Sequence, residues 1–193
     1  LEALNYLKSQ NIVHCDLKPE NIFFINNTSY NVVIGDYGMA QLEHARDRIL
    51  YYYIQTRWYR SPEIILHIPY SYSIDMWSVG AIAIELFTNT PIFKSNNEFE
   101  LLYIMEHVVG EVLTEKVLAL NDIRCNKKNV NNIIDEYIDY NYSVSSNYKL
   151  NHHILTLKQQ LRQFPHKIIT EFIKQIFIWN PDERITPEKA LRL

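Results

Sequence analysis

Apolar side chains recur at intervals of three or four residues in several parts of the chain, beginning with Leu1, Leu4 and Leu7. This spacing is typical of an α-helix with one buried face. Over residues 74–88 the apolar positions occupy most faces, which indicates a helix that is buried all round. The pattern predicts helices over residues 1–10, 74–88, 98–107 and 168–177, with Ser73 as a cap, and further helix starts at Ser61-Pro62 and Thr186-Pro187.

Two short apolar runs, residues 22–25 and 32–34, flank the turn-forming sequence Asn26-Asn27-Thr28-Ser29. Such an arrangement predicts a small β-hairpin. The stretch before it, residues 14–21, is too short and too charged for a core element and is expected to be a loop. Residues 39–60 lack regular periodicity and mix charged with aromatic side chains, which favours a long surface loop.

The region from 108 to 163 has the weakest pattern. It is rich in Asn, Asp, Lys and Tyr, with no glycine after Gly110 and no proline before Pro165. We expect an insert with helical pieces there. The 193 residues, 47% of them hydrophobic, suffice for one compact core, so the sequence predicts a single, mainly α domain.

Composition argues against several classes of function. A formal net charge of -3 provides no basic surface for nucleic acid. The longest apolar run, residues 79–86, is shorter than the ~20 residues of a membrane helix and contains Glu85, so no membrane partner is expected. Cys15 and Cys125 lie far apart without metal-binding spacing. This argues against disulfides and for a reducing compartment, cytoplasmic or nuclear.

One polar constellation carries candidate chemistry. The sequence His14-Cys15-Asp16-Leu17-Lys18-Pro19-Glu20-Asn21 is followed, after the predicted hairpin, by Asp36-Tyr37-Gly38. Phosphoryl transfer requires an aligned hydroxyl, neutralisation of charge on the transferring group and metal ions that bridge phosphates. Asp16 can accept the proton of a substrate hydroxyl, and Lys18 can place its ammonium on the γ-phosphate. Asn21 and Asp36 offer the hard oxygen ligands that Mg2+ prefers.

These motifs resemble the catalytic loop and the metal-binding motif of eukaryotic protein kinases. Ser61-Pro62-Glu63 and Asp75-Met76-Trp77-Ser78 are similar to two later motifs of that family, in the same order. The resemblance implies a kinase C-terminal lobe, a helical bundle with small β-hairpins at the catalytic cleft, which uses ATP and Mg2+ on protein substrates. It also implies that His14 supports the catalytic loop, that Asp75 holds the backbone of this loop, and that Glu63 pairs with Arg184.

The resemblance narrows to one branch of the family. The sequence YYYIQTRWYRSPE, residues 51–63, together with Cys15 resembles the dual-specificity tyrosine-regulated kinases of the CMGC group. Residues 69–78 fit the same group, with a leaning toward its yak branch. By its position, the stretch 108–163 would be the insert of that group. The resemblance also implies Ser or Thr acceptors in protein substrates, and tolerance of proline after the acceptor.

Cys15 stands where most kinases have an arginine that reads the activating phosphate. The resemblance implies instead that Tyr53 is autophosphorylated, with Arg57 and Arg60 as partners of the phosphate. Each of these residues also has a plainer interpretation. Tyr53 could be an ordinary packing aromatic, the two arginines could be solvated surface charges, and we interpret Cys15 as a packing residue.

The sequence shows no N-terminal kinase lobe. The four glycines form no glycine-rich phosphate loop, and only 13 residues precede His14. Since helical spacing already begins at Leu1, we expect residues missing upstream and a truncated chain that is inactive alone.

Three functions remain open at this stage. The chain could be part of an active protein kinase, a non-catalytic lobe that acts as a binding module, or a small-molecule phosphotransferase. The joint presence of Asp16, Lys18, Asn21 and Asp36 favours the first, because a binding module has no chemical need for all four.

Overall fold

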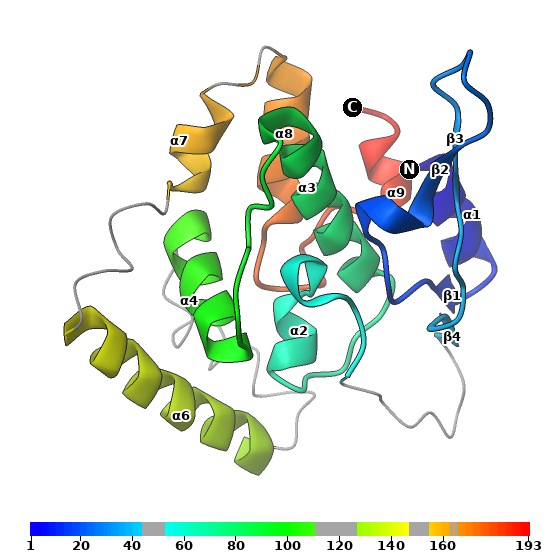
Figure 1. Cartoon of the computed structure of the whole chain (residues 1–193). Helices are drawn as coiled ribbons and strands as arrows, with labels where there is room; N and C mark the ends of the chain where they lie inside the picture. Colours follow the sequence, from blue (N-terminus) through cyan, green and yellow to red (C-terminus); the bar gives the residue numbers. More distant parts are fainter. Residues whose placement is uncertain (44–52, 111–126, 147–154, 163, 165) are drawn as a thin grey trace.

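The computed structural model describes residues 1–43, 53–110, 127–146, 155–162, 164 and 166–193 (Figure 1). In these ranges the chain is mainly helical, as predicted. The helices are α1 (Glu2–Ser9), α2 (Pro62–Ile65), α3 (Ser73–Thr88), α4 (Glu98–Val109), α6 (Lys127–Ser146), α7 (Leu157–Leu161), α8 (Lys167–Ile176) and α9 (Pro187–Ala190), with short 3-10 helices η1 (Pro19–Asn21) and η2 (Arg57–Tyr59). Parts of the predicted insert (111–126 and 147–154), Tyr51, Tyr52 and Cys125 lie outside the described residues.

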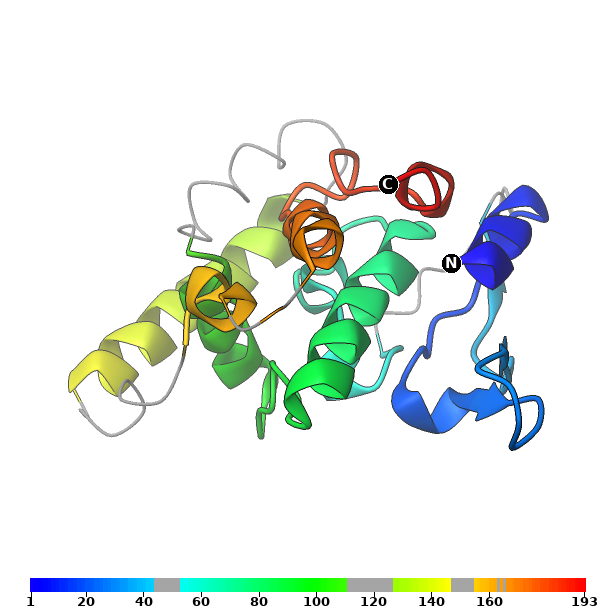
Figure 2. The same cartoon turned by 90° about the horizontal axis from the view of Figure 1, so that it is seen from above.

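Helix α3 is the centre of the fold. Figures 1 and 2 show α4 and α8 on one side of α3, and α1 with the β2–β3 hairpin on the other. Most of its residues are buried, as its apolar pattern predicted. The prediction of Ser73 as a cap was wrong, because Ser73 is the first helical residue and no side chain caps the helix. The helix ends at Asn89, whose φ of 56° lies in the left-handed region that Asn tolerates.

A close approach between α3 and the end of α8 tightens the core. A Cβ atom on Gly80 would lie 2.4 Å from Cγ2 of Ile176, so only glycine fits without displacement. One turn away, Trp77 packs against Phe177 and Phe93, with ring centroids 4.9 and 5.5 Å apart. Each buried Phe contributes about 1.5–3 kcal/mol. This packing makes α3 a rigid support for the residues bound to its first turns.

Two small antiparallel sheets carry the polar loops. Strands β2 (Ile22–Phe24) and β3 (Val32–Ile34) form the predicted hairpin, with Phe23 opposite Val33. Strands β1 (Ile12–Val13) and β4 (Gln41–Leu42) also pair, although residues 39–60 were expected to be loop. Two residues on each side are too few to produce a visible period. Because β1 and β4 directly flank residues 14–40, their pairing brings the two ends of this stretch together.

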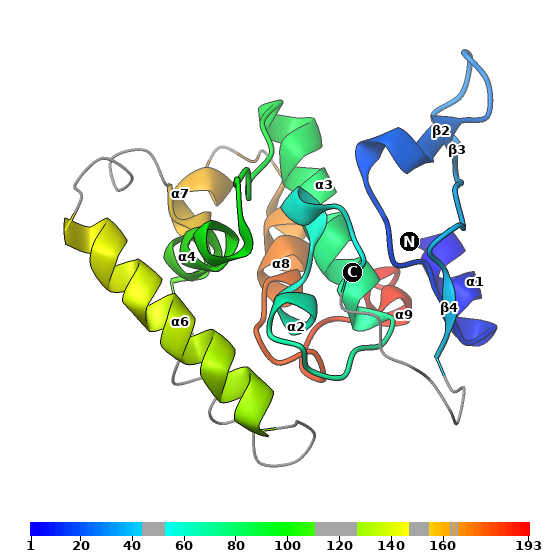
Figure 3. The same cartoon turned by 60° about the horizontal axis from the view of Figure 1, so that its bottom comes forward.

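The predicted helical pieces of the insert are present where the structure describes it. Helix α6 runs beside α4 (Figure 3). It is buried at Val130, Ile134 and Tyr137, and the Tyr137 hydroxyl donates to Glu106 on α4. Helix α7 begins with a capping box between Thr156 and Gln159. The described part of the insert therefore belongs to the same helical core.

Candidate active site

The candidate catalytic loop, residues 14–21, is hydrogen-bonded to Asp75 on α3. The carboxylate of Asp75 accepts hydrogen bonds from the backbone N–H groups of His14 (2.8 Å) and Cys15 (3.0 Å). Cys15 has a φ of 68°, so the backbone turns sharply at this point. Burial raises the pKa of Asp75 to about 7, while the two backbone hydrogen bonds oppose that rise. The loop therefore has a fixed path over the first turn of α3.

Asp16 lies at the centre of a three-residue cluster. Its Oδ2 accepts from Lys18 Nζ at 2.8 Å, and its Oδ1 accepts from the backbone N–H and the hydroxyl of Thr56, at 2.9 and 2.8 Å. Burial alone would raise the pKa of Asp16, but the hydrogen bonds from Lys18 and Thr56 outweigh burial and hold this pKa below its ordinary value. Asp16 is therefore ionised at neutral pH and can accept a proton from a hydroxyl.

Thr56 was not predicted as a site residue. It lies 40 positions from Asp16 in the sequence, and its hydroxyl also accepts from Lys18 Nζ at 3.3 Å. No periodicity or spacing marks it, because its role arises from a contact between two distant loops.

Asn21 and Asp36, the predicted metal ligands, lie at the two ends of the hairpin. Asn21 donates through Nδ2 to the carbonyl oxygen of Asp16 at 2.9 Å, which turns its own Oδ1 away from that carbonyl. Asp36 has a φ of 58° and is exposed. The pKa of Lys18 is raised chiefly by its hydrogen bond to Asp16, with a further contribution from Asp36. Lys18 is therefore paired with Asp16 and lies within electrostatic range of Asp36.

The donor chemistry of this region fits Mg2+ held together with a phosphate. Asn21 and Asp36 supply an amide and a carboxylate oxygen, which are hard ligands. Within the described ranges, no group of three or more His, Cys, Asp or Glu side chains could hold a metal alone. A metal here would therefore need further oxygens from its ligand or from water.

The side chain of His14 is hydrogen-bonded to the backbone of Asp16 and Gly35. The residue is buried, its Nδ1 accepts from the backbone N–H of Asp16 at 3.3 Å, and its Nε2 lies 3.1 Å from the carbonyl oxygen of Gly35. This pairing requires the proton on Nε2. Burial lowers the pKa of His14, and its ring packs 5.0 Å from that of Tyr37. Cys15 is likewise buried, so its expected packing position is confirmed.

The predicted regulatory residues lie on the next segment of chain. Tyr53 is 82% exposed, and its ring centroid lies 5.5 Å from the guanidinium carbon of Arg60. Arg57 is half-buried, and its Nε has no hydrogen-bond partner within the described part of the chain. Together with Asp16, these residues line one cavity beside the candidate catalytic loop.

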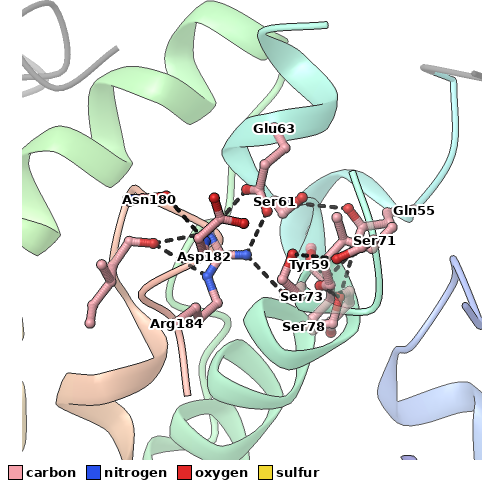
Figure 4. A network of polar contacts seen from close by, with 12 residues as sticks. Gln55, Tyr59, Ser61, Glu63, Ser71, Ser73, Ser78, Asn180, Asp182 and Arg184 are labelled. Carbon is pink, nitrogen blue, oxygen red and sulfur yellow. Dashed lines mark hydrogen bonds and ion pairs between the residues drawn. The ribbon is translucent and has the colours of Figure 1, made fainter. Parts of the chain in front are cut away.

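Gln55 connects this segment to α3 and was also not predicted. Its φ is 62°, and its buried side chain donates to the carbonyl oxygen of Ile74 and to Ser78 Oγ, at 3.0 and 2.9 Å (Figure 4). Its Oε1 accepts from the backbone N–H of Ser61 at 2.9 Å, at the start of α2. The Gln55 side-chain amide therefore links the segment between Tyr53 and α2 to helix α3.

Glu63 and Arg184 form a buried ion pair next to this network (Figure 4). Nη1 and Nη2 of Arg184 donate to Oε1 and Oε2 of Glu63, at 2.6 and 3.0 Å, and both side chains are 0% exposed. Arg184 also donates to the carbonyl oxygens of Ser73 and Ile178. The pair therefore ties α2 to α3 and to the chain after α8.

The whole chain, residues 1–193, matches the protein kinase domain family. The chain belongs to this family. Dual specificity tyrosine-phosphorylation-regulated kinase 4 of Homo sapiens is 33% identical over 195 residues, which cover 100% of this chain and 35% of that protein. The dual specificity protein kinase YAK1 of Saccharomyces cerevisiae is 50% identical over 102 residues, which cover 53% of this chain and 12% of that protein.

A third relative, dual specificity tyrosine-phosphorylation-regulated kinase 2 of Drosophila melanogaster, is 36% identical over 194 residues, 98% of this chain and 25% of that protein. These relatives confirm the resemblance to the dual-specificity tyrosine-regulated and yak-type kinases. The chain spans only about a quarter to a third of the length of the two relatives that it matches almost completely. In the part of the chain that the structure describes, no helix has the length and apolarity to cross a membrane.

Proposed function

We propose that this chain carries the catalytic centre of a protein kinase that transfers the γ-phosphoryl group of Mg-ATP to Ser or Thr hydroxyls of proteins. The observation that carries the proposal is the cluster in which Asp16 is held by Lys18 and Thr56, with Asn21 bonded to the carbonyl oxygen of Asp16 and Asp36 within electrostatic range of Lys18. Phosphoryl transfer depends on positioning and on charge neutralisation. A carboxylate, an ammonium group and two oxygen donors held in one place meet those needs.

Each residue of the cluster has a role in this proposal. Asp16 aligns the acceptor hydroxyl and takes its proton, and Lys18 neutralises the transferring phosphoryl group. Asn21 and Asp36 would hold Mg2+, which would neutralise negative charge on the phosphates. Thr56 positions Asp16 through its two hydrogen bonds.

The backbone at Gln55 bears on which residue type a substrate peptide can carry directly after the phosphorylated Ser or Thr. The carbonyl oxygen of Gln55 accepts from Nε and Nη2 of Arg60 at 3.2 and 2.8 Å. It is therefore turned away from a peptide in the cavity beside Asp16, and it cannot accept a hydrogen bond from that peptide. Proline has no backbone N–H, so a proline directly after the acceptor forgoes no hydrogen bond at this position. We propose proline-tolerant protein substrates for this reason.

The chain is proposed to form the C-terminal lobe, with 108–163 as an insert, and to depend on other residues to cover ATP. Tyr53 is proposed as the autophosphorylated residue, since it is exposed and lies beside two arginines. The alternative is a non-catalytic binding module. It does not explain why Asp16 is hydrogen-bonded to Lys18 and Thr56, because a binding module needs no such cluster.

Replacement of Asp16 by Asn in the full-length protein tests the proposal. The variant should lose phosphorylation of Ser/Thr peptides by several orders of magnitude, because the amide cannot accept the hydroxyl proton. Asp139→Asn, an exposed aspartate on α6, is the matched control and should leave the rate unchanged. Equal turnover by Asp16→Asn and the control would refute the proposal.

A further inference from the structure

An ion pair joins the segment after Tyr53 to the first residue of α4. Nη1 of Arg60 donates to Oε1 of Glu98 at 2.6 Å. The Arg60 side chain is 6% exposed, whereas that of Glu98 is 44% exposed. Glu98 is therefore a carboxylate at the surface that binds an almost buried guanidinium group.

Tyr53 lies over the same guanidinium group. Its ring centroid is 5.5 Å from the guanidinium carbon, and its side chain projects into solvent. Burial lowers the pKa of Arg60, Glu98 opposes that shift and the charge of Arg57 adds to it, so all these groups lie within electrostatic range. Two arginines and one carboxylate therefore lie in the neighbourhood of Tyr53.

Arg60 cannot move freely toward such a phosphate. Its Nε donates to the carbonyl oxygens of Ile54 and Gln55, at 3.0 and 3.2 Å, and its Nη2 donates to Gln55 at 2.8 Å. These bonds fix the plane of the guanidinium group. A phosphate that bound Nη1 would lie close to the Glu98 carboxylate, and its charge of about -1.5 to -2 would repel that carboxylate.

Arg57 differs from Arg60 in this respect. Its Nε has no hydrogen-bond partner in the described ranges, and its side chain lines the same cavity as Tyr53. A phosphate bound by Arg57 would therefore lie beside no bound carboxylate, whereas a phosphate bound by Nη1 of Arg60 would share this nitrogen with Glu98.

We propose that Glu98 competes with the phosphate of Tyr53 for Arg60. Phosphorylation of Tyr53 then breaks the ion pair between Arg60 and Glu98, the first residue of α4. The inference rests on the proposed role of Tyr53. Glu98 then sets how strongly the chain retains its phosphotyrosine. The released carboxylate remains favourable at the N-terminus of α4, where the helix dipole attracts negative charge.

The test uses the full-length protein with phosphotyrosine inserted at position 53 during translation, so the result does not depend on autophosphorylation. The rate of phosphate removal by an added tyrosine phosphatase is compared in the parent, Glu98→Gln and Glu100→Gln proteins. Loss of the competing carboxylate should slow removal on the order of fivefold in Glu98→Gln. The Glu100 carboxylate accepts hydrogen bonds from Asn96 and, among the described residues, makes no ion pair with Arg60, so its variant should match the parent.

Unchanged or faster removal in Glu98→Gln would overturn the proposal, since a carboxylate that helps to position Arg60 would give the opposite sign. Phosphorus NMR supplies a second readout. The second pKa of the phosphate should be lower in Glu98→Gln than in the parent, and equal values would also overturn the proposal. Glu98→Asp, which keeps the charge but is one methylene shorter, replaces Glu98→Gln if the latter fails to fold. Absence of Tyr53 phosphate in the active parent protein would count separately, against the proposed autophosphorylation.

Discussion

Replacement of Glu63 by Gln removes one partner of the buried ion pair and leaves the charge of Arg184 in the core. Both side chains are 0% exposed, so water cannot take the place of the missing carboxylate. Removal of one partner of a buried, hydrogen-bonded pair typically costs about 3–5 kcal/mol, because the remaining charge is left uncompensated. A domain of this size has a total stability of about 5–15 kcal/mol, so the variant should lose a large share of it.

The structure also predicts an order among the variants. Arg184 donates to Glu63 and, in addition, to the carbonyl oxygens of Ser73 and Ile178. Arg184→Met should therefore destabilise at least as much as Glu63→Gln, because it leaves the buried carboxylate of Glu63 without its partner and removes one donor from each of two carbonyl groups.

Urea unfolding followed by fluorescence measures these differences. The control is Glu188→Gln, which breaks an ion pair to Arg192 of the same 2.6 Å length whose side chains are 54% and 75% exposed. Exposed pairs contribute about 0–1 kcal/mol, so the control should shift the midpoint little. If Glu63→Gln shifted it no more than Glu188→Gln, the buried pair would not support the fold as argued.

Three other outcomes are expected. Burial lowers the pKa of His14, so the stability contributed by its neutral ring is complete above the unfolded-state pKa of about 6.5 and is lost as pH falls through the folded-state value; Tm should fall on acidification, and less so in His14→Asn. Thr56→Val should lower kcat by about 10- to 100-fold, because Asp16 loses its hydroxyl donor, whereas Thr56→Ser should retain activity, as measured by steady-state kinetics. Arg60→Lys, which cannot hold the Gln55 carbonyl with a planar fork, should reduce the preference for Ser-Pro over Ser-Ala peptides in competition assays.

The sequence was most informative for elements whose conformation is determined by their own residues. The 3.6-residue period predicted α1, α3, α4 and α8, and the Asn-rich turn predicted the β2–β3 hairpin. Strands β1 and β4 were missed, since two residues carry no period and their pairing depends on segments about 30 positions apart.

The candidate site shows the same division. Asp16, Lys18, Asn21 and Asp36 could be named because they stand in short motifs. Thr56 and Gln55 could not, because a threonine and a glutamine in an aromatic-rich segment acquire their roles only through contacts with Asp16 and α3. The pair of Glu63 and Arg184, 121 positions apart, was expected only through the family resemblance.

The first turns of α3 hold both loops of the site. Asp75 binds the backbone of the catalytic loop, and one turn of helix spans Ile74 and Ser78, which bind the Gln55 side chain. Thr56 follows Gln55 directly and therefore reaches Asp16 only while both anchors are in place. A shift of α3 relative to either loop would thus separate the Thr56 hydroxyl from Asp16. For this reason the packing of Trp77 and Gly80 against the end of α8, although remote from any substrate, bears on the geometry of the reacting group.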